Sequence, residues 1–389
     1  MSAATQTTTV PAQEVALPTA TLDKYKAAAT VVSSVLQQII SKATDGKNIL
    51  ELCEEGDKLV EEGVKGLYNK VKGTPKGIAF PTTVSVNNVI QNFSPVPSDK
   101  EAAAQSLKSE DIVKIVVGAH IDGYPVVSGE TIVVGSESVS GVKADLIQAA
   151  YQAGEIALRT VKPGVRNWEV TDAIKSLFKE YEASGVKGVE GILSHQFTQN
   201  NLEAKKGLVS TPTASQRSDS DNAYLFEEGE VYGLNINVTN GDKTPKTSDI
   251  QKTTIFSKTP TTYMLKMKTS RATFSEISTK AGSFPFTLRI MEDETRARMG
   301  VKECVQHNLV KGYELTTCDK PTDLTANIFL TFAVTKTGAT RISLPPTYYS
   351  AEKVKSEVQL SEETKSTLAK SLKAKVQKKK KTPAAEEKK

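Results

Sequence analysis

Apolar side chains recur at the three- and four-residue spacing of amphipathic helices in four stretches of the chain. Leu22–Lys42 and Ile49–Tyr68 form a first pair, and Ala144–Thr160 and Trp168–Ser184 form a second pair. A short glycine-containing turn separates the two members of each pair. The second pair follows the first after roughly 120 residues, a period that indicates an internal repeat. The pattern therefore predicts one helical hairpin in each half of the chain.

Segments with strand-like patterning repeat at a similar interval. Glu110–Gly118 resembles Glu228–Ile236, 118 residues later. Ile112–Ile121 and Tyr124–Val134 enclose Asp122-Gly123, a dipeptide that favours the positive φ angles of a type I′ hairpin turn. We expect an α/β (α+β) fold in which the two halves form one pseudo-twofold sheet with helices on its outer face. Chance similarity of two α/β units is the alternative.

Composition predicts how the rest of the chain is organised. A final hairpin is expected from Leu324–Val334 and Ala339–Leu344, and a short amphipathic segment, Ala351–Leu372, follows it. Between Lys252 and Arg298 the chain is rich in Lys, Arg, Thr, Ser and Phe. The expected division is a disordered tail over residues 1–21, a main domain over 22–345 with halves 22–143 and 144–258 and a basic insert over 259–310, and a C-terminal helical segment with a lysine-rich tail over 346–389.

Positive charge is concentrated at the C-terminal end. Residues 365–389 hold ten Lys and two Glu, a local charge of +8, whereas the whole chain carries +5 and the other 364 residues therefore −3. Such a run repels itself and is expected to stay unfolded. It suits a phosphate backbone or a nuclear-import receptor, and the alternative is a solubilising tail without a fixed partner. The tail lysines are Lys373, Lys375, Lys378, Lys379, Lys380 and Lys381.

Several classes of protein are excluded by what the chain lacks. Its three cysteines, Cys53, Cys304 and Cys318, form neither a disulfide framework nor a zinc motif, which favours an intracellular protein. No stretch approaches 18 uncharged apolar residues, so a membrane span is not expected. The Gly-x-Ser-x-Gly, P-loop and His-Glu-x-x-His motifs are also absent from the sequence.

A set of short motifs then points to a known family. The motifs are Gly77-Ile78-Ala79-Phe80-Pro81-Thr82, Val86-Asn87-Asn88, Phe93-Ser94-Pro95, Gly191-Ile192-Leu193-Ser194-His195-Gln196, Glu230-Val231-Tyr232 and Leu265-Lys266-Met267-Lys268-Thr269-Ser270-Arg271. Together they resemble the proliferation-associated, ErbB-receptor-binding and curved-DNA-binding group of methionine-aminopeptidase-like proteins. The resemblance covers about residues 22–345 and implies the pita-bread fold of type II methionine aminopeptidases.

The same resemblance implies where a catalytic metal centre would lie. The enzymes hold two metal ions with two Asp, one His and two Glu, because carboxylates must neutralise two neighbouring dications and help generate a hydroxide. The matching positions here are Val116, Val127, His195, Asn235 and Phe329, and a further active-site His is matched by Asn92. One imidazole cannot offset the desolvation of a dication. We expect an inactivated aminopeptidase homologue with no metal or other cofactor; a residual metallo-aminopeptidase is the alternative.

Without catalysis, the resemblance implies a binding protein. Relatives of this group are similar in binding the large ribosomal subunit near the nascent-chain exit, through rRNA and exit-site proteins. The expected RNA-binding cations are Lys258, Lys266, Lys268, Arg271, Lys280, Arg289, Arg296 and Arg298. Alternation in Leu265–Lys268 would place both lysines on one face of a strand, about 7 Å apart, above a buried Leu265 and Met267.

Two other interpretations of the basic residues stay open. The same cations and the lysine tail would serve a DNA-binding transcriptional co-regulator, with strong salt dependence. Alternatively, the lysines of the insert only protect a solvated sheet edge from aggregation. We expect the protein in the cytoplasm and in the nucleus or nucleolus. A monomer is favoured, although the sequence leaves the oligomeric state open.

Overall fold

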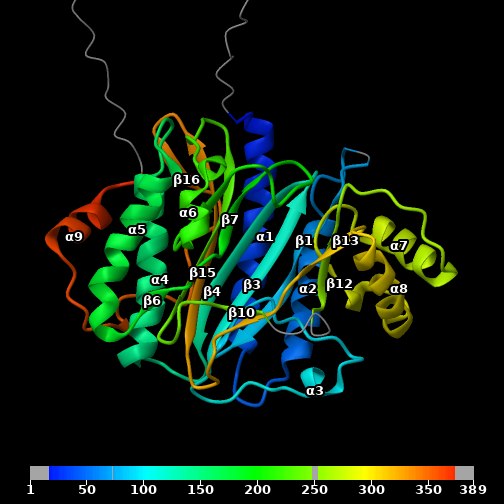
Figure 1. The fold of residues 1–389 in the computed structure, drawn as a ribbon, viewed down its shortest axis with the longest axis horizontal. Helices are drawn as coiled ribbons and strands as arrows, with labels where there is room; N and C mark the ends of the chain where they lie inside the picture. Colours follow the sequence, from blue (N-terminus) through cyan, green and yellow to red (C-terminus); the bar gives the residue numbers. More distant parts are fainter. Residues whose placement is uncertain (1–16, 72, 248–252, 373–389) are drawn as a thin grey trace, which may run out of the picture.

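A large antiparallel sheet forms the centre of the protein (Figure 1). The computed structural model describes residues 17–71, 73–247 and 253–372. In these ranges the strand order is β1 (Lys76–Val86), β3 (Ile112–Ile121), β4 (Tyr124–Val133), β15 (Thr325–Thr335), β9 (Val231–Thr239), β7 (Leu193–Phe197) and β8 (Gly207–Val209), with β16 (Gly338–Arg341) on β15 and β6 (Lys187–Gly188) on β9. The C-terminal strand β15 therefore lies between the two halves and joins them.

Four helices cover one face of this sheet. α1 (Thr19–Lys42) and α2 (Ile49–Lys65) contact β3, β4 and β1, whereas α4 (Gly141–Thr160) contacts β15 and β9 and carries α5 (Asn167–Tyr181) outside it. The repeat of two helix pairs is thus confirmed. α1 begins at Thr19, which places residues 19–21 of the expected tail in a helix. α2 ends three residues earlier than expected, and a 3₁₀ turn over Glu182–Ser184 completes the fourth predicted helix.

Local sequence explains these boundaries. Asn48 precedes α2, and its side chain accepts a hydrogen bond from the Glu51 amide at 3.1 Å, which satisfies one free N–H of the first helical turn. Asp122 and Gly123 have φ angles of 55° and 76°, so the predicted type I′ turn between β3 and β4 is confirmed. The last hairpin is also present, but β16 ends at Arg341 rather than Leu344.

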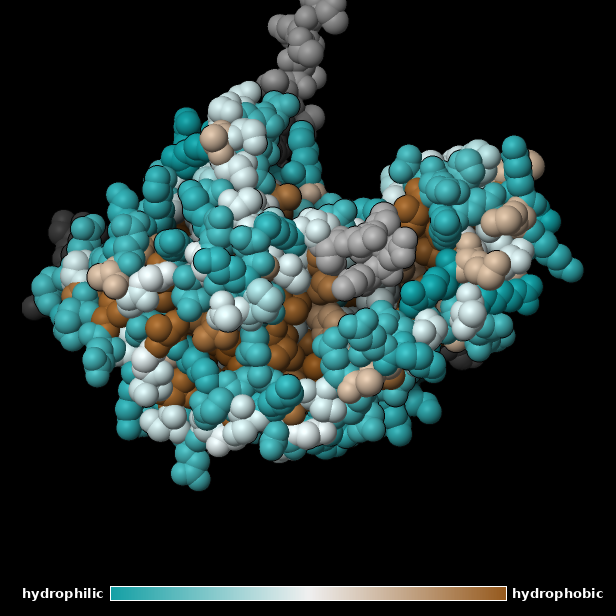
Figure 2. Space-filling model, turned by 60° about the horizontal axis from the view of Figure 1, so that its bottom comes forward, coloured by the Kyte–Doolittle hydropathy of each residue, from teal (hydrophilic) through white to brown (hydrophobic). Residues whose placement is uncertain are grey.

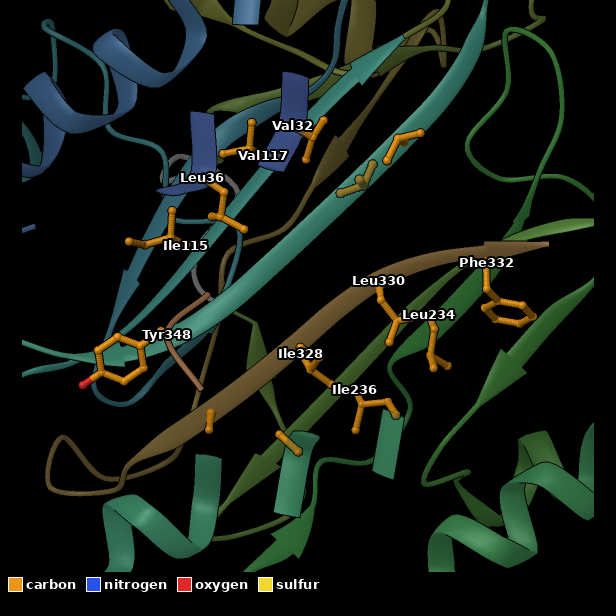
Figure 3. Close-up of a cluster of buried hydrophobic side chains, with 14 of the residues drawn as sticks. Val32, Leu36, Ile115, Val117, Leu234, Ile236, Ile328, Leu330, Phe332 and Tyr348 are labelled. Carbon is orange, nitrogen blue, oxygen red and sulfur yellow. The ribbon is translucent and has the colours of Figure 1, made fainter. Parts of the chain in front are cut away.

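The hydrophobic core lies between the sheet and these helices (Figure 3). Val32 and Leu36 of α1 point toward Ile115 and Val117 of β3. On the other half, apolar side chains of β9 and β15 pack toward α4: Leu234, Ile236, Ile328, Leu330 and Phe332. Because strand side chains alternate between faces, the residues between these core positions lie on the opposite face of the sheet.

Residues 255–313 form a smaller unit beside the main sheet (Figure 1). It consists of β11 (Ile255–Lys258), α7 (Lys268–Lys280), β12 (Phe286–Thr287), α8 (Glu294–Gln306) and β13 (Val310–Tyr313), with strand order β12-β11-β13. The unit has its own apolar cluster, which includes Leu265, Ile277 and Cys304. This is the segment in which the sequence predicts a basic insert.

The strand predicted at Leu265–Lys268 is wrong. Residues 261–267 are irregular and Lys268 begins α7. Leu265 is buried as expected, but Met267 is half-exposed rather than packed beneath the lysines. Of the four residues only Lys268 is helical: α7 forms because Thr273 and Ile277 recur at helical spacing and bury one face of this helix against α8.

Shorter elements connect the layers. They are β2 (Val89–Gln91), α3 (Lys100–Ala103), β5 (Val139–Ser140), α6 (Ala214–Ser218), β10 (Lys246–Thr247), β14 (Thr316–Thr317), β17 (Val354–Lys355) and α9 (Glu362–Ala369). Only the α9 part of the predicted amphipathic segment Ala351–Leu372 is helical, and it lies against α4. The lysine cluster Lys373–Lys381 lies outside the described residues. In the described ranges, no helix is both long and apolar enough to cross a membrane.

The outer surface is mainly hydrophilic. In the view of Figure 2, hydrophobic surface gathers in the middle of the face, and hydrophilic residues surround it. The largest exposed apolar side chains include three methionines of the smaller unit, Met264, Met267 and Met299.

Candidate functional site

A cavity of about 260 Å³ lies against the face of the sheet that the helices leave uncovered. Its lining includes all six positions that the sequence matches to the aminopeptidase centre: Asn92, Val116, Val127, His195, Asn235 and Phe329. These residues come from segments up to 237 positions apart in the chain. The six positions therefore converge on one place.

Strand alternation and register bring them together. Val116 of β3 and Val127 of β4 project from adjacent strands, and Phe329 of β15 is the register partner of Asn235 of β9. His195 lies on β7 opposite Gly233 of β9. A β-carbon on Gly233 would approach the Phe197 ring to 2.1 Å, so the missing side chain is what lets β7 and β9 pair beside the cavity.

A cluster of amides surrounds Asn235, the cavity residue that the resemblance matches to a metal-binding Glu. Asn327 Nδ2 donates to Asn235 Oδ1 at 2.7 Å and to Asn237 Oδ1 at 3.1 Å, and Asn235 Nδ2 donates to Gln91 Oε1 at 3.1 Å. Oδ1 of Asn327 is buried without a partner among the described residues. Sequence reasoning missed Asn237 and Asn327. The available signal was the Asn-x-Asn alternation at 235 and 237 in an otherwise apolar strand.

His195 is held in the neutral state. Burial, with a smaller contribution from the Lys311 ammonium, lowers the pKa of His195 to about 4. Lys311 is itself ion-paired with Glu203, which also lines the cavity.

Asn92 has a structural role. Its φ is 70°, and its Nδ2 donates to the Glu314 carbonyl at 2.9 Å. It therefore fastens the end of β2 to the segment after β13.

Lys114 is a further cavity residue that the sequence did not single out. It is fully buried, and its Nζ donates to the Asn87 carbonyl at 2.7 Å. Burial lowers the pKa of this amine well below its ordinary value. A buried amine disfavours a second positive charge nearby, as long as it is protonated.

The residues of this cavity do not fit a pair of divalent cations. Val116, Val127 and Phe329 offer no donor atom, and the amide of Asn235 carries no negative charge. Glu203 is occupied by Lys311. Across residues 17–71, 73–247 and 253–372, no three His, Cys, Asp or Glu side chains group as a metal would require.

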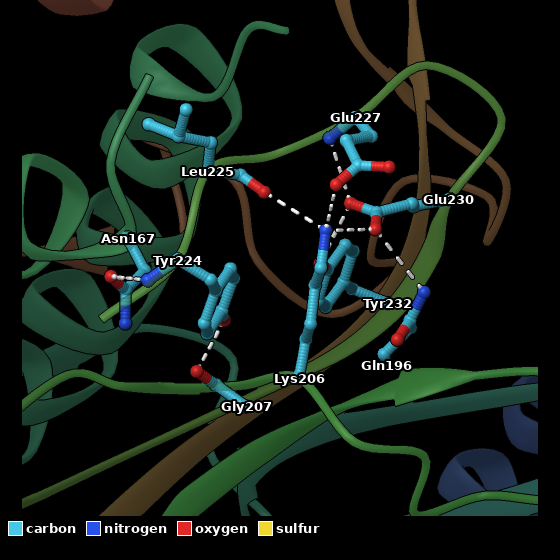
Figure 4. A network of polar contacts seen from close by, with 9 residues as sticks. All are labelled: Asn167, Gln196, Lys206, Gly207, Tyr224, Leu225, Glu227, Glu230 and Tyr232. Carbon is cyan, nitrogen blue, oxygen red and sulfur yellow. Dashed lines mark hydrogen bonds and ion pairs between the residues drawn. The ribbon is translucent and has the colours of Figure 1, made fainter. Parts of the chain in front are cut away.

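A polar network fixes the strands beside the cavity (Figure 4). Lys206 Nζ lies 2.5 Å from Glu230 Oε1 and 2.8 Å from Glu227 Oε1, and it donates to the Leu225 carbonyl at 3.0 Å. Tyr232 donates to the second Glu230 oxygen at 2.9 Å. The two carboxylates share the Lys206 ammonium, so each charged group has a partner within the network. It therefore holds the connection from β8 to β9 rather than offering free groups to a ligand.

The expected RNA-binding cations do not all face solvent. Lys266, Lys268 and Arg296 are exposed and have no ion pair in the described part of the chain. Arg271 is exposed, but its Nη1 donates to the carbonyls of Leu265 and Lys266 at 3.1 and 2.8 Å. It thus supports the loop that carries the lysines.

Three other expected cations are partly engaged. Lys258 donates to Ser278 Oγ at 2.9 Å. Lys280 pairs with Glu276 at 2.8 Å, and Arg298 lies 3.5 Å from Glu294. The two basic side chains of these ion pairs are 34% and 39% exposed, so they remain partly accessible to solvent. These three side chains are therefore secondary candidates for a nucleic-acid contact.

The assignment of Arg289 to the RNA surface is wrong. Its side chain is only 5% exposed and lies 2.6 Å from Asp57 of α2. Its Nη1 also donates to Ser94 Oγ and to the Pro95 carbonyl, each at 2.8 Å. Burial with a partner satisfies the guanidinium inside the protein. Arg289 therefore fastens the smaller unit to the main sheet.

Comparisons with known proteins agree with this geometry. The model of metallopeptidase family M24 matches residues 23–280. The curved DNA-binding protein of Schizosaccharomyces pombe is 44% identical over 324 residues, 83% of each chain. The ERBB-3 binding protein 1 of Solanum tuberosum is 41% identical over 322 residues, which are 82% of this chain and 80% of that protein.

Solved structures show the same fold. A thermophilic Arx1 superposes with a TM-score of 0.83 at 33% identity, over 92% of this chain and 100% of that one. The methionine aminopeptidase of Thermotoga maritima has a TM-score of 0.54 at 16% identity, over 84% of this chain and 98% of that one. At this identity the similarity is evidence for the fold only. The expected pita-bread fold is thus confirmed. The chain belongs to the M24 metallopeptidase family, in its group of proliferation-associated, ErbB-receptor-binding and curved-DNA-binding proteins.

Proposed function

We propose that this chain is a non-catalytic methionine-aminopeptidase-like protein that binds the large ribosomal subunit. It would contact rRNA and proteins near the nascent-chain exit and take part in ribosome-linked growth regulation, in the cytoplasm and the nucleus. One observation carries the proposal: the six aminopeptidase positions meet in one cavity, and four of them present Val116, Val127, Asn235 and Phe329 instead of carboxylates. With hydrolysis disfavoured, binding is the function that the fold still supports.

The candidate binding surface is the exposed side of the smaller unit. Lys266 and Lys268 lie just before and at the start of α7, and Arg296 lies on α8. Their charges are not neutralised by neighbouring carboxylates among the described residues. RNA duplexes are recognised mainly through backbone and shape, so such cations suffice for a contact without a base-specific motif. The domain boundaries proposed from the sequence place this surface inside residues 259–310.

Co-sedimentation with purified large ribosomal subunits tests the proposal. Lys266→Glu/Lys268→Glu should lose most binding while the protein stays folded, because both side chains are exposed and their ammonium groups make no contact with the part of the chain that the structure describes. Lys175→Glu/Lys179→Glu, on the exposed face of α5, has the same charge change and serves as the control. Neutralising one phosphate-contacting lysine should also lower the salt slope by about 1. Unchanged co-sedimentation of the first variant would remove this surface from the proposal.

A DNA-binding regulator is the second candidate, and the name of the 44% identical relative favours it. Competition between a curved DNA duplex and large subunits separates the two functions. The leading proposal expects subunits to displace the DNA at physiological salt. If DNA displaces the subunits instead, the order of the two proposals is reversed.

Release of methionine from a short peptide, with added cobalt or manganese, tests the third candidate. The neutral floor of the cavity leads us to expect no turnover above background. Turnover that disappears in a His195→Ala variant would overturn the non-catalytic proposal. Among the matched positions, only His195 keeps the metal-binding residue of the enzymes.

A further inference from the structure

Exposed methionines form an unusual surface on the smaller unit. Met264, Met299, Met267 and Tyr263 are 87%, 67%, 50% and 40% exposed. We call these four residues the methionine platform. Single exposed apolar residues are ordinary, but three thioethers and a ring in one small unit indicate a contact surface. The proposed ribosome surface, built on charge, does not use them.

Polar contacts bring the platform residues to one place. Glu303 of α8 accepts a hydrogen bond from the Lys266 amide at 3.2 Å, so the loop lies on α8. Met299 precedes Glu303 by one helical turn and shares its face. Tyr263 stacks on His307, one turn after Glu303, with ring centroids 3.7 Å apart. The platform residues therefore lie along one ridge formed by the loop and α8.

The loop is also held in shape before any partner arrives. Arg271 donates to two of its carbonyls, and Leu265 is buried in the apolar cluster of the unit. The nearby Ser270 hydroxyl and the amides of the loop lower the pKa of Glu303. A surface fixed in this way loses little conformational entropy on binding.

The charges around the platform select the partner. Lys266 and Lys268 flank Met267 at the end of the loop and the start of α7, and Lys302 follows Met299 on α8. These three lysines are exposed and have no ion pair among the described residues. The ridge also carries the carboxylate of Glu303, but this residue is buried and its Oε1 accepts the Lys266 amide of the loop. A polyanion with flat apolar groups matches alternating ammonium and thioether groups. Unpaired nucleotides have that chemistry, because phosphates flank a base that is free to stack.

We infer that the methionine platform binds an unpaired RNA base, while Lys266, Lys268 and Lys302 hold the flanking phosphates. The inference rests on the proposed RNA-binding function and adds a preference within it: a bulged or looped nucleotide over a continuous duplex. The thioethers and the side of the Tyr263 ring that faces away from His307 provide the stacking area. The lysines provide affinity that is independent of sequence.

Fluorescence anisotropy with two RNA probes tests this inference on the full chain. One probe is a perfect duplex, and the other is the same duplex with one unpaired adenine. Wild-type protein should bind the bulged probe about tenfold more tightly, the scale expected from stacking one base. Met264→Ser/Met267→Ser/Met299→Ser should remove most of this preference, since only Tyr263 of the platform is kept, and should keep the affinity for the perfect duplex. Val71→Ser/Leu344→Ser removes exposed apolar side chains elsewhere and should retain the preference.

The possible failures are distinguishable. Equal wild-type affinity for both probes overturns the platform inference and leaves the proposed function intact. Absence of binding to either probe counts against the RNA surface itself. If the methionine variant loses ribosome co-sedimentation although wild-type protein binds both RNAs equally, the platform belongs to a protein partner and the inference is wrong.

Discussion

The ion pair between Asp57 and Arg289 gives the sharpest stability prediction. Asp57 Oδ2 lies 2.6 Å from the guanidinium, and Asp57 Oδ1 accepts the Thr82 amide at 2.7 Å. Asp57→Ala would leave Arg289 charged, buried and short of its strongest acceptor. Its Nε already has no partner among the described residues. Breaking a buried pair by removing one partner costs about 3–5 kcal/mol of unfolding free energy.

Urea unfolding followed by circular dichroism measures this loss. Glu62→Ala is the matched control, since Glu62 and Lys58 on the same helix are 59% and 73% exposed and lie 3.9 Å apart. That exposed pair should contribute no more than about 1 kcal/mol. The double variant Asp57→Ala/Arg289→Met should lose less unfolding free energy than the sum of the losses in the two single variants, because it contains no unpaired buried charge.

Two results would refute this reasoning. If Asp57→Ala lowers the unfolding free energy no more than Glu62→Ala does, the buried guanidinium of Arg289 does not need Asp57 for stability. If a folded Arg289→Met protein loses ribosome co-sedimentation as strongly as Lys266→Glu/Lys268→Glu, Arg289 contacts the ribosome despite its burial. The expected outcome is a destabilised protein whose folded fraction still binds.

Two further predictions concern the strands beside the cavity. Burial keeps the pKa of His195 at about 4, below the unfolded value of about 6.5, so the unfolded state binds more protons between these values. Unfolding free energy should fall as pH drops from about 6.5 to 4, and an NMR titration that shows a midpoint near 6.5 for His195 would contradict this. Gly233→Ala should cost about 1–3 kcal/mol, because the new methyl group meets the Phe197 ring at 2.1 Å. Gly66→Ala, with nothing within 4 Å, should keep or raise the unfolding midpoint; similar losses for both variants would rule out the steric cause.

Much of the fold could be predicted from local sequence. Helical spacing located α1, α2, α4 and α5, and Asp122-Gly123 fixed the hairpin turn between β3 and β4, since both signals act over a few residues. The positions lining the cavity were also accessible, because motif resemblance carried six of them to numbered residues. These features depend on short-range pattern or on a family motif.

Tertiary structure decided what no local pattern encodes. Arg289 looked like part of a basic surface, and only its approach to Asp57, 232 residues away in the chain, shows that its charge is used internally. The alternation at Leu265–Lys268 favoured a strand, but Leu265–Met267 lie in an irregular loop and Lys268 begins α7, which packs on α8. The amide cluster of Asn235, Asn237 and Asn327 likewise arises from the register of β9 with β15. Burial and partners depend on contacts between distant segments, so a sequence determines which side chains are available and the fold determines which of them face solvent.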